Sequence, residues 1–297
     1  MNVESKVWLV TGSSRGLGRA LAEEILEAGH RLVATARTPG DLASLVERYG
    51  DRVRAVALDV TDEAAAQAAV RVARETFGAL DVVVNNAGYA NTASFEDMAP
   101  DDFRAQIDTN FYGVVHVTRA ALPVLRAQRS GTILQISSIG GRRGGTPGLS
   151  AYQASKFALE GFSDVVAAEV APLGIRVVIV EPGGFATDWG GSSMTVHPTQ
   201  PHYASTVGMI AEHIRGNPEA GRGDPRRAAR AMLTVAGAKE VPRRLLLGTD
   251  ALFLAQATEA ERGREAAAWA ELTSSTDRDG VGSFADSDIA RRMVGEP

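Results

Sequence analysis

The sequence contains no cysteine, and this absence removes several kinds of chemistry. Disulfide bonds, thiolate nucleophiles and cysteine-ligated metal sites are all excluded. A chain without disulfide bonds suits a reducing compartment, so we expect a cytoplasmic protein. The five histidines show no spacing typical of metal ligands, and we therefore predict no metal site.

Long apolar runs and blocks of like charge are also missing. No apolar run approaches the roughly 20 residues that span a bilayer, and the first residues lack the pattern of a signal peptide. The net charge is −5 without a basic block, so we expect neither a membrane nor a nucleic acid as partner. The remaining composition, 44% hydrophobic in 297 residues, is typical of a globular protein with a sizeable core.

Strand-like and helix-like segments alternate through the first two-thirds of the chain. Strands are predicted at Val7–Thr11, Arg31–Ala36, Val53–Val60, Leu80–Val84, Thr132–Ser137 and Arg176–Val180. Helices are predicted at Arg19–Ala28, Glu63–Phe77, Asp101–Gln128 and Ala151–Ala171. This alternation predicts an α/β fold, a doubly wound, Rossmann-like parallel sheet of about seven strands with helices on both faces.

Beyond Pro182 the alternation loosens. Residues 189–223 are rich in Gly, Ser, Thr, His and Pro, and a loop of this length in a compact domain is usually functional. Regular patterns return with a helix at Pro225–Ala236, a strand at Arg244–Leu247 and a helix at Asp250–Glu271. We therefore predict one catalytic domain over residues 1–272, with a substrate loop at 189–223, a helix-strand-helix at 224–272, and a tail at 273–297.

A glycine-rich turn stands where the first strand passes into the first helix. It reads Thr11-Gly12-Ser13-Ser14-Arg15-Gly16-Leu17-Gly18. Glycine lets the backbone approach a pyrophosphate closely, and the helix that follows offers free N–H groups to phosphate oxygens. In this position the turn predicts a dinucleotide site.

The end of the second predicted strand indicates which dinucleotide is bound. NAD sites usually place a carboxylate there to bind the ribose hydroxyl groups. Here Ala36 is followed by Arg37 and Thr38, so a guanidinium is available to pair with a 2′-phosphate and no acid stands there to repel it. Arg15, in the glycine turn, is a second cation for the same phosphate. The pattern favours NADP over NAD.

Tyr152 and Lys156 stand four residues apart near the start of a predicted helix. This spacing puts the phenol and the ammonium on one face, one turn apart. A phenol has an ordinary pKa of about 10, and a neighbouring cation lowers that pKa toward the range needed for proton transfer at neutral pH. The pair therefore predicts a site of acid–base chemistry.

Further motifs complete a recognisable set. They are Asp59-Val60, Asn85-Asn86-Ala87-Gly88, Asn110, Ser137-Ser138 and Pro182-Gly183 followed by Thr187. In this order and spacing, over about residues 5–190, the chain resembles the short-chain dehydrogenase/reductase family. It is most similar to the single-domain, NADP-preferring branch, here with a C-terminal extension. The resemblance implies an oxidoreductase that interconverts a carbonyl and a secondary alcohol with NADP(H).

The resemblance also implies a role for each matching residue. Tyr152 is the implied proton donor and acceptor, Lys156 lowers its pKa and holds the nicotinamide ribose, and Ser138 binds the substrate oxygen. Asn110 is implied to hold a water that links Lys156 to solvent. The residues implied in cofactor binding are Gly12, Ser14, Arg15, Gly16, Leu17, Gly18, Arg37, Thr38, Asp59, Val60, Asn86, Ala87, Gly88, Tyr152, Lys156, Pro182, Gly183 and Thr187.

One spacing departs from the family pattern. Ser138 and Tyr152 are fourteen positions apart, one more than is usual in the family. The glycine-rich segment between them can absorb an extra residue, and Ile139 has no hydroxyl, so the role stays with Ser138. We expect the additional arginine, in Arg142-Arg143, to alter the rim of the substrate pocket. Asn85 is expected to tie neighbouring strands together.

The substrate is not fixed by these motifs. We expect a small carbonyl or alcohol compound, and the apolar candidates Trp189, Met194 and Tyr203 in the predicted loop favour a non-ionic one. The family resemblance implies a homodimer or homotetramer formed through the helices at 101–128 and 151–171. Two other hypotheses stay open, a nucleotide-sugar epimerase or dehydratase and a non-catalytic NADP(H)-binding sensor.

Overall fold

The computed structural model describes residues 5–187, 194–216 and 221–294. The chain forms two compact units, Met1–Ala255 and Gln256–Pro297, which are described separately below.

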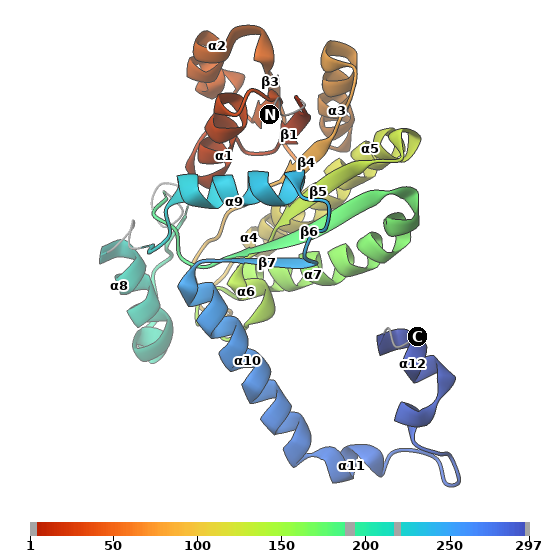
Figure 1. The fold of residues 1–297 in the computed structure, drawn as a ribbon. Coiled ribbons are helices and arrows are strands. Elements are labelled where there is room, and N and C mark those ends of the chain that lie inside the picture. The colour runs from red at the N-terminus through yellow and green to blue at the C-terminus, as the bar shows by residue number, and fades with distance from the viewer. Residues whose placement is uncertain (1–4, 188–193, 217–220, 295–297) are drawn as a thin grey trace. The chain divides into compact units, whose positions relative to one another are not determined.

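The first unit is built on one parallel sheet of seven strands, shown in Figure 1. The strands are β1 (Val7–Val10), β2 (Arg31–Ala36), β3 (Val53–Ala57), β4 (Val82–Asn85), β5 (Gly131–Ile136), β6 (Ile175–Pro182) and β7 (Arg244–Leu247). Their order across the sheet is β3-β2-β1-β4-β5-β6-β7, and Val10 of β1 is in register with Ala34 and Val84. The order reverses beside β1, which is where such sheets bind ligands. The predicted Rossmann-like class is confirmed.

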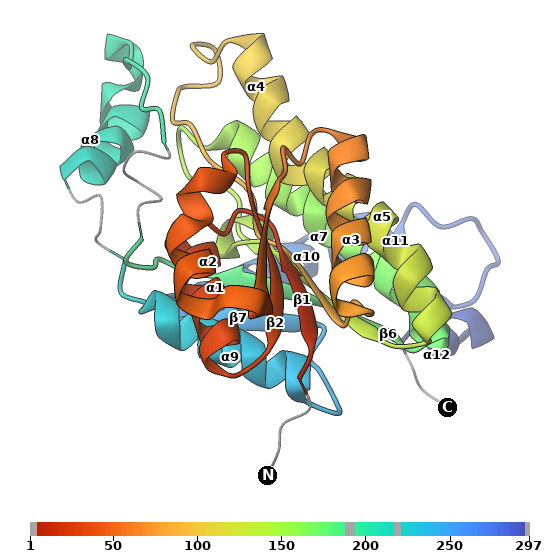
Figure 2. The same ribbon diagram turned by 90° about the horizontal axis from the view of Figure 1, so that it is seen from above.

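Each face of the sheet is covered by its own helices (Figure 2). Successive strand residues point to opposite faces, so Trp8 and Val10 pack in one cluster while Val7 and Leu9 pack in another. The first cluster includes residues of α1 (Gly16–Glu27), α2 (Ala43–Tyr49) and α9 (Pro225–Gly237). The second includes residues of α3 (Glu63–Phe77), α5 (Gly113–Gln128) and α7 (Ser150–Val170). Burial on both faces explains why the strands are continuous apolar runs.

Two helical details differ from the sequence prediction. The single helix expected at 101–128 consists of α4 (Pro100–Ile107), a π-helical turn η3 (Asp108–Tyr112) and α5. A π turn adds one residue to a helical turn, a change too small to disturb the apolar periodicity. Helix α2 was not predicted, because only Leu45 and Tyr49 of its seven residues are buried and the pattern is therefore weak.

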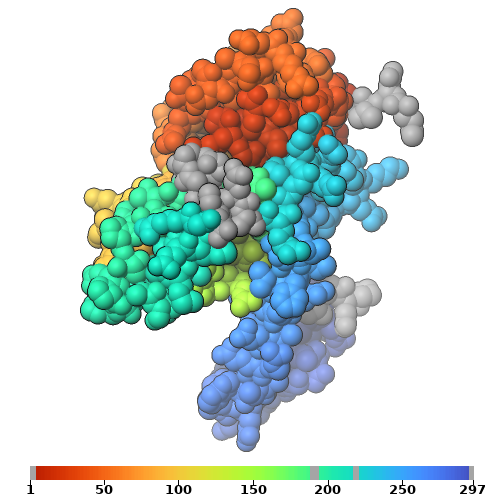
Figure 3. Space-filling model, turned by 90° about the vertical axis from the view of Figure 1, so that its left-hand side faces the viewer, coloured from red at the N-terminus to blue at the C-terminus, as the bar shows by residue number. Residues whose placement is uncertain are grey.

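The predicted substrate loop contains helical structure. Residues 194–216 include the short turns η6 (Pro201–Tyr203) and η7 (Ala204–Gly208), followed by helix α8 (Met209–Gly216). Val207 and Ala211, four positions apart, are buried on one side of this segment. Figure 3 shows residues 194–216, in green and teal, as a surface lobe of the first unit. The many polar residues around so few buried ones hid the helical pattern.

The second unit is helical and mostly exposed. Helix α10 (Thr249–Ala268) crosses the boundary between the units, and α11 (Ala270–Ser274), η8 (Phe284–Asp286) and α12 (Asp288–Val294) follow it. The predicted tail therefore includes a short helix. That the catalytic domain extends to residue 272 stays a prediction. In the part of the chain that is described, no helix has both the length and the apolar character needed to cross a membrane.

Candidate active site

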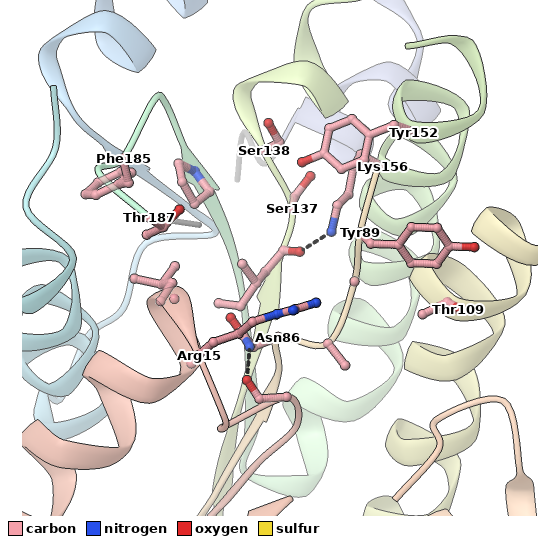
Figure 4. Close-up of a pocket in the computed structure, with 18 of the residues that line it drawn as sticks. Arg15, Asn86, Tyr89, Thr109, Ser137, Ser138, Tyr152, Lys156, Phe185 and Thr187 are labelled. Atoms are coloured by element: carbon pink, nitrogen blue, oxygen red, sulfur yellow. Dashed lines mark hydrogen bonds between the residues drawn. The ribbon is translucent and has the colours of Figure 1, made fainter. Parts of the chain in front are cut away.

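A cavity of about 920 Å³ opens at the carboxyl ends of the central strands. It is lined by every residue predicted for cofactor binding or catalysis except Asn110. Figure 4 shows Ser138, Tyr152 and Lys156 on one side of the cavity, with Phe185 and Thr187 on the opposite side. The fold thus brings the separate sequence motifs to one place.

The glycine turn forms an open backbone cradle at one end of this cavity. Gly12 and Gly16 have φ values of +68° and +56°, in the region that favours glycine. A Cβ on Gly18 would collide with the carbonyl oxygen of Gly12 and the side-chain amide of Asn86. Helix α1 begins at Gly16, and its N-cap residue Arg15 makes no side-chain capping bond. The N–H groups of its first turn are therefore not capped by that side chain.

Asn86 holds the cradle in place. Its side-chain amide donates hydrogen bonds to the carbonyl oxygens of Thr11 (2.8 Å) and Gly12 (3.1 Å). The Thr11 hydroxyl oxygen accepts bonds from the backbone N–H groups of Asn86 and Ala87, both at 2.9 Å. Asn86 lines the cavity, as predicted, and its amide nitrogen is engaged with the backbone of the turn.

Asn85 ties strands together, as expected from the sequence. Its side-chain amide donates to Gln135 Oε1 of β5 at 2.8 Å and to Thr118 Oγ1 of α5 at 3.0 Å. The residue is buried, so these bonds satisfy donors that water does not reach.

The end of β2 forms another part of the cavity wall. The segment Ala36–Thr38 lines it, but so does Asp41, which corrects the expectation that no carboxylate stands there. Hydrogen bonds from the hydroxyl and backbone N–H of Thr61 lower the pKa of Asp59, and the charge of Arg37 adds to this effect. Arg37 therefore lies within electrostatic reach of the predicted adenosine end.

Tyr152 and Lys156 lie side by side at the start of α7, and both are buried. Lys156 Nζ donates to the carbonyl oxygen of Ile136 at 2.7 Å and lies 5.7 Å from the centre of the Tyr152 ring. The side chains of Tyr152 and Ser138 are joined by a hydrogen bond. The structure thus brings three of the four predicted catalytic side chains together, despite the extra residue between Ser138 and Tyr152.

Burial governs the protonation of this pair. It raises the pKa of Tyr152, and the hydrogen bond with Ser138 opposes this only in part. Burial also lowers the pKa of Lys156 to about 8, against the opposing effect of the Glu160 carboxylate. The sequence predicted a lowered phenol pKa, whereas burial raises it here, because the phenolate would lose its contact with water and only the Ser138 hydrogen bond opposes that loss.

Ser138 is followed directly by the short helix α6 (Ile139–Arg142). Ser138 caps this helix, since its Oγ accepts a bond from the backbone N–H of Gly140 at 3.0 Å. Arg142 then turns inward and binds Glu181 through two hydrogen bonds, at 2.9 and 3.1 Å. Neither arginine of Arg142-Arg143 lines the cavity, and the Arg142 side chain is engaged with this buried carboxylate. Arg143, by contrast, is exposed.

Asn110 lies behind the cavity wall instead of in it. Its side-chain oxygen accepts from Tyr89 N at 3.0 Å, and its amide donates to Tyr89 O at 2.8 Å and Ser155 Oγ at 3.2 Å. Asn110 is fully buried within the π turn. Its side chain fixes the loop after β4. That Asn110 holds a water linking Lys156 to solvent stays a prediction.

Several cavity residues were missed because no local motif marks them, whether they lie in loops or in η3, α7 and α8. They include Tyr89, Asn91, Thr109, Thr146, Leu149, Gln153, Phe185, Thr195, His213 and Ile214. Of the predicted apolar candidates, Met194 packs against Tyr152, whereas the Tyr203 hydroxyl donates to exposed Glu96 at 2.7 Å. Trp189 lies outside the described residues.

Comparison with known proteins agrees with this architecture. The family model for short chain dehydrogenases matches residues 6–195. Oxidoreductase BOA17 of Botryotinia fuckeliana is 50% identical over 270 residues, which cover 91% of this chain and 98% of that protein. A short-chain dehydrogenase from Streptomyces avermitilis has a TM-score of 0.87 at 38% identity, covering 93% of this chain and 100% of that chain.

A solved enzyme of known activity is also similar. The 3-ketoacyl-(acyl-carrier-protein) reductase of Brucella melitensis, complexed with NADH, has a TM-score of 0.68 at 27% identity. It covers 82% of this chain and 97% of its own length. The sheet order, the cavity and the sequence matches lead to one assignment. The chain belongs to the short-chain dehydrogenase family of oxidoreductases, which act on CH–OH groups.

Proposed function

We propose that this protein reduces a small carbonyl compound to a secondary alcohol with NADPH, with Tyr152 as the proton donor. The observation that carries the proposal is the convergence of Tyr152, Ser138 and Lys156 on one wall of a cavity that also contains the glycine turn. An acid, a hydrogen-bond donor and a cation placed together are what carbonyl reduction requires of a protein.

The chain's own residues fit a dinucleotide. The positive φ values of Gly12 and Gly16 and the uncapped start of α1 leave backbone N–H groups for a pyrophosphate. Thr187 closes the same end, because a Cβ on Gly16 would lie 3.7 Å from the Thr187 Cβ. Lys156 would hold the nicotinamide ribose. When bound, the reduced nicotinamide supplies the hydride.

Tyr152 would donate its proton to the carbonyl oxygen as negative charge develops there. Ser138 would donate a hydrogen bond to the same oxygen and so stabilise that charge. Burial raises the pKa of Tyr152, which keeps the phenol protonated at neutral pH. The protonated phenol is the form that reduction consumes.

The preference for NADP rests on Arg37, aided by Arg15. Both are exposed at the cavity, where a guanidinium binds a 2′-phosphate through charge-assisted bonds. Asp41 stands in the same region and opposes this preference by repulsion. The Brucella reductase was solved with NADH, so the choice between the two cofactors is a property to be measured for each relative.

We further propose a homodimer or homotetramer that associates through α5 and α7. Phe157 and Val165 are exposed apolar side chains on α7, and Tyr112 is exposed at the start of α5. The substrate would be a small carbonyl compound bound beside Leu149 and Ile214. The cytoplasmic location expected from the sequence stays a prediction.

Oxidation of NADPH across a panel of ketones and aldehydes tests the proposed function. Replacing Tyr152 by Phe removes the proton donor, and we expect kcat to fall by about 10²- to 10⁴-fold. Tyr49→Phe, the same substitution in α2 and away from the cavity, is the matched control and should keep its rate. Turnover that survives Tyr152→Phe would contradict the proposed mechanism.

A further inference from the structure

A four-residue spacing continues along α7 beyond the catalytic pair. Tyr152 and Lys156 are followed by Glu160 and then Asp164, each one helical turn further on. Glu160 is only 5% exposed, although an isolated buried carboxylate is strongly unfavourable. The mechanism proposed above gives it no part. Its burial therefore calls for partners, and the structure supplies them.

Glu160 is held from two sides. Its Oε1 accepts a hydrogen bond from Ser137 Oγ at 2.7 Å, at the end of β5. Arg244 of β7 lies 3.6 Å from the Glu160 carboxylate, 3.1 Å from Glu181 and 2.6 Å from Asp164. The Arg244 guanidinium thus lies within ion-pair distance of three carboxylates, two on α7 and one on β6.

The cluster formed by Arg244 and its three carboxylates also extends to the segment that carries Ser138. Glu181, fully buried at the end of β6, binds Arg142 of α6 as well as Arg244. A Cβ on Gly141 would lie 2.5 Å from Glu160 Oε1 and 3.1 Å from Lys156 Cβ, so both side chains pack against this glycine. Helix α6 therefore packs against α7 at the turn that carries Lys156 and Glu160.

The charges of the cluster leave a role for Lys156. Glu160, Glu181 and Asp164 carry three negative charges, whereas Arg142 and Arg244 carry two positive ones. One negative charge remains, and the ammonium of Lys156, one turn before Glu160, is a positive charge within electrostatic reach of it. A buried charge is strongly unfavourable without an opposite charge close by.

We propose that Glu160 is a positioning residue for Lys156: its anchored carboxylate keeps the neighbouring ammonium protonated inside the cavity. The inference rests on the proposed function for its catalytic meaning, because Lys156 acts there as a cation. Ser137 and Arg244 hold the Glu160 carboxylate in place. The Arg142–Glu181 pair links α6, the helix that Ser138 caps, to the same cluster of charged residues.

The protonation equilibria agree with this geometry. Burial lowers the pKa of Lys156 to about 8, and the Glu160 charge acts in the opposite direction. Burial raises the pKa of Glu160 itself, and Ser137 and the two guanidiniums counteract that rise. The titratable and charged groups that face this pair are Tyr152 and Asp164 of α7, Arg142 of α6, Glu181 of β6, Arg244 of β7 and Tyr89 of the loop after β4. Without the Glu160 charge, the Lys156 pKa should fall further.

The chain offers a direct measurement, because it contains only three lysines, Lys6, Lys156 and Lys239. When lysine is labelled with ¹³C at Cε, each of the three lysine side chains gives one NMR signal. The variants Lys6→Arg and Lys239→Arg each remove one signal and so identify the signals of Lys6 and Lys239. In the unaltered protein the Lys156 signal should titrate near pH 8. In Glu160→Gln we expect its midpoint to fall by about one pH unit or more.

Two further variants keep the test decisive. Glu169→Gln, the same change at an exposed site on the same helix, should leave the Lys156 midpoint unchanged. If Glu160→Gln does not fold, Glu160→Met removes the same charge without burying an unpaired amide and should give the same fall. An unchanged Lys156 midpoint in a folded Glu160 variant would overturn the inference.

The pH profile of kcat/KM for NADPH-dependent reduction supplies the functional arm. The alkaline limb should move to lower pH in Glu160→Gln, by the amount that the NMR midpoint moves, and stay in place in Glu169→Gln. The NMR titration needs no turnover, so the two ideas fail separately. A Glu160→Gln variant with unchanged titration overturns this inference alone, whereas turnover in Tyr152→Phe overturns the proposed function alone.

Discussion

The two sides of the cavity are built in different ways. The cofactor side is fixed by backbone, through the positive-φ glycines of the turn and the Asn86 amide that bonds to Thr11 and Gly12. Few of its contacts depend on long side chains. A wall built from backbone is rigid and does not depend on the substrate, which suits a cofactor that many reactions share.

On the side that we propose for the substrate, Asn91 and Thr195 line the cavity, and they lie in surface segments far apart in the chain. Thr92 pairs by backbone with the segment around Thr195, and His197 Nε2 lies 2.9 Å from Asp102 Oδ2. Tyr203 reaches exposed Glu96. Partly exposed contacts of this kind are weak, so this wall can change between relatives without harm to the fold. On the proposed function, the comparison assigns cofactor binding to the core of the fold and substrate choice to its edge.

The sharpest way to break the cofactor side is Gly18→Ala. The new methyl group would collide with the Gly12 carbonyl and the Asn86 amide, neither of which can move freely. We expect a loss of about 3 kcal/mol or more in the free energy of unfolding, measured by urea denaturation.

Gly161→Ala is the matched control on α7. A Cβ there meets nothing within 4 Å, and the added alanine should leave stability unchanged or raise it by up to about 1 kcal/mol. Equal stability of the Gly18 and Gly161 variants would show that the cradle tolerates a side chain and is not fixed as described.

Arg37→Ala tests whether this residue selects NADPH over NADH on the cofactor side. Loss of a charge-assisted contact with the 2′-phosphate should lower kcat/KM for NADPH by about 10- to 100-fold and leave NADH nearly unaffected. Arg71→Ala, exposed on α3, is the control. If kcat/KM falls equally for NADPH and NADH, Arg37 supports the site in general and does not bind the 2′-phosphate.

Asp102→Asn tests the substrate side and should have the smallest effect. It weakens the contact with His197, a partly exposed pair of about 1 kcal/mol or less, so the carbonyl KM should rise by about fivefold at most. The KM for NADPH should not change. Asp101→Asn, whose nearest partner is Arg104, is the neighbouring control. A rise in the NADPH KM would mean that the two sides are coupled.

Much of the cofactor side could be predicted from the sequence, because its physical causes are local. A turn that needs glycine, a strand that ends in asparagine and a tyrosine one turn from a lysine each leave a short pattern. The doubly wound parallel sheet followed from the alternation of elements, and β2 and β7 begin and end where predicted.

The remaining features depend on contacts that no short pattern records. The inward turn of Arg142 requires Glu181, which is distant in sequence, and the side-chain contacts of Asn110 follow from a π turn that leaves the periodicity intact. The pKa of Tyr152 is raised by burial, and the four-residue spacing to Lys156 carries no information on burial. Asp41 and the helical turns of 201–216 were missed for similar reasons.

The most direct test of the central claim separates binding from chemistry in one variant. NADPH affinity and the single-turnover rate of NADPH oxidation would be measured on the same samples of unaltered protein and Tyr152→Phe. The account predicts a Kd within about threefold of the unaltered protein and a rate at least about 100-fold lower. A retained rate, or a loss explained entirely by weaker NADPH binding, would contradict the assignment of Tyr152 as the proton donor.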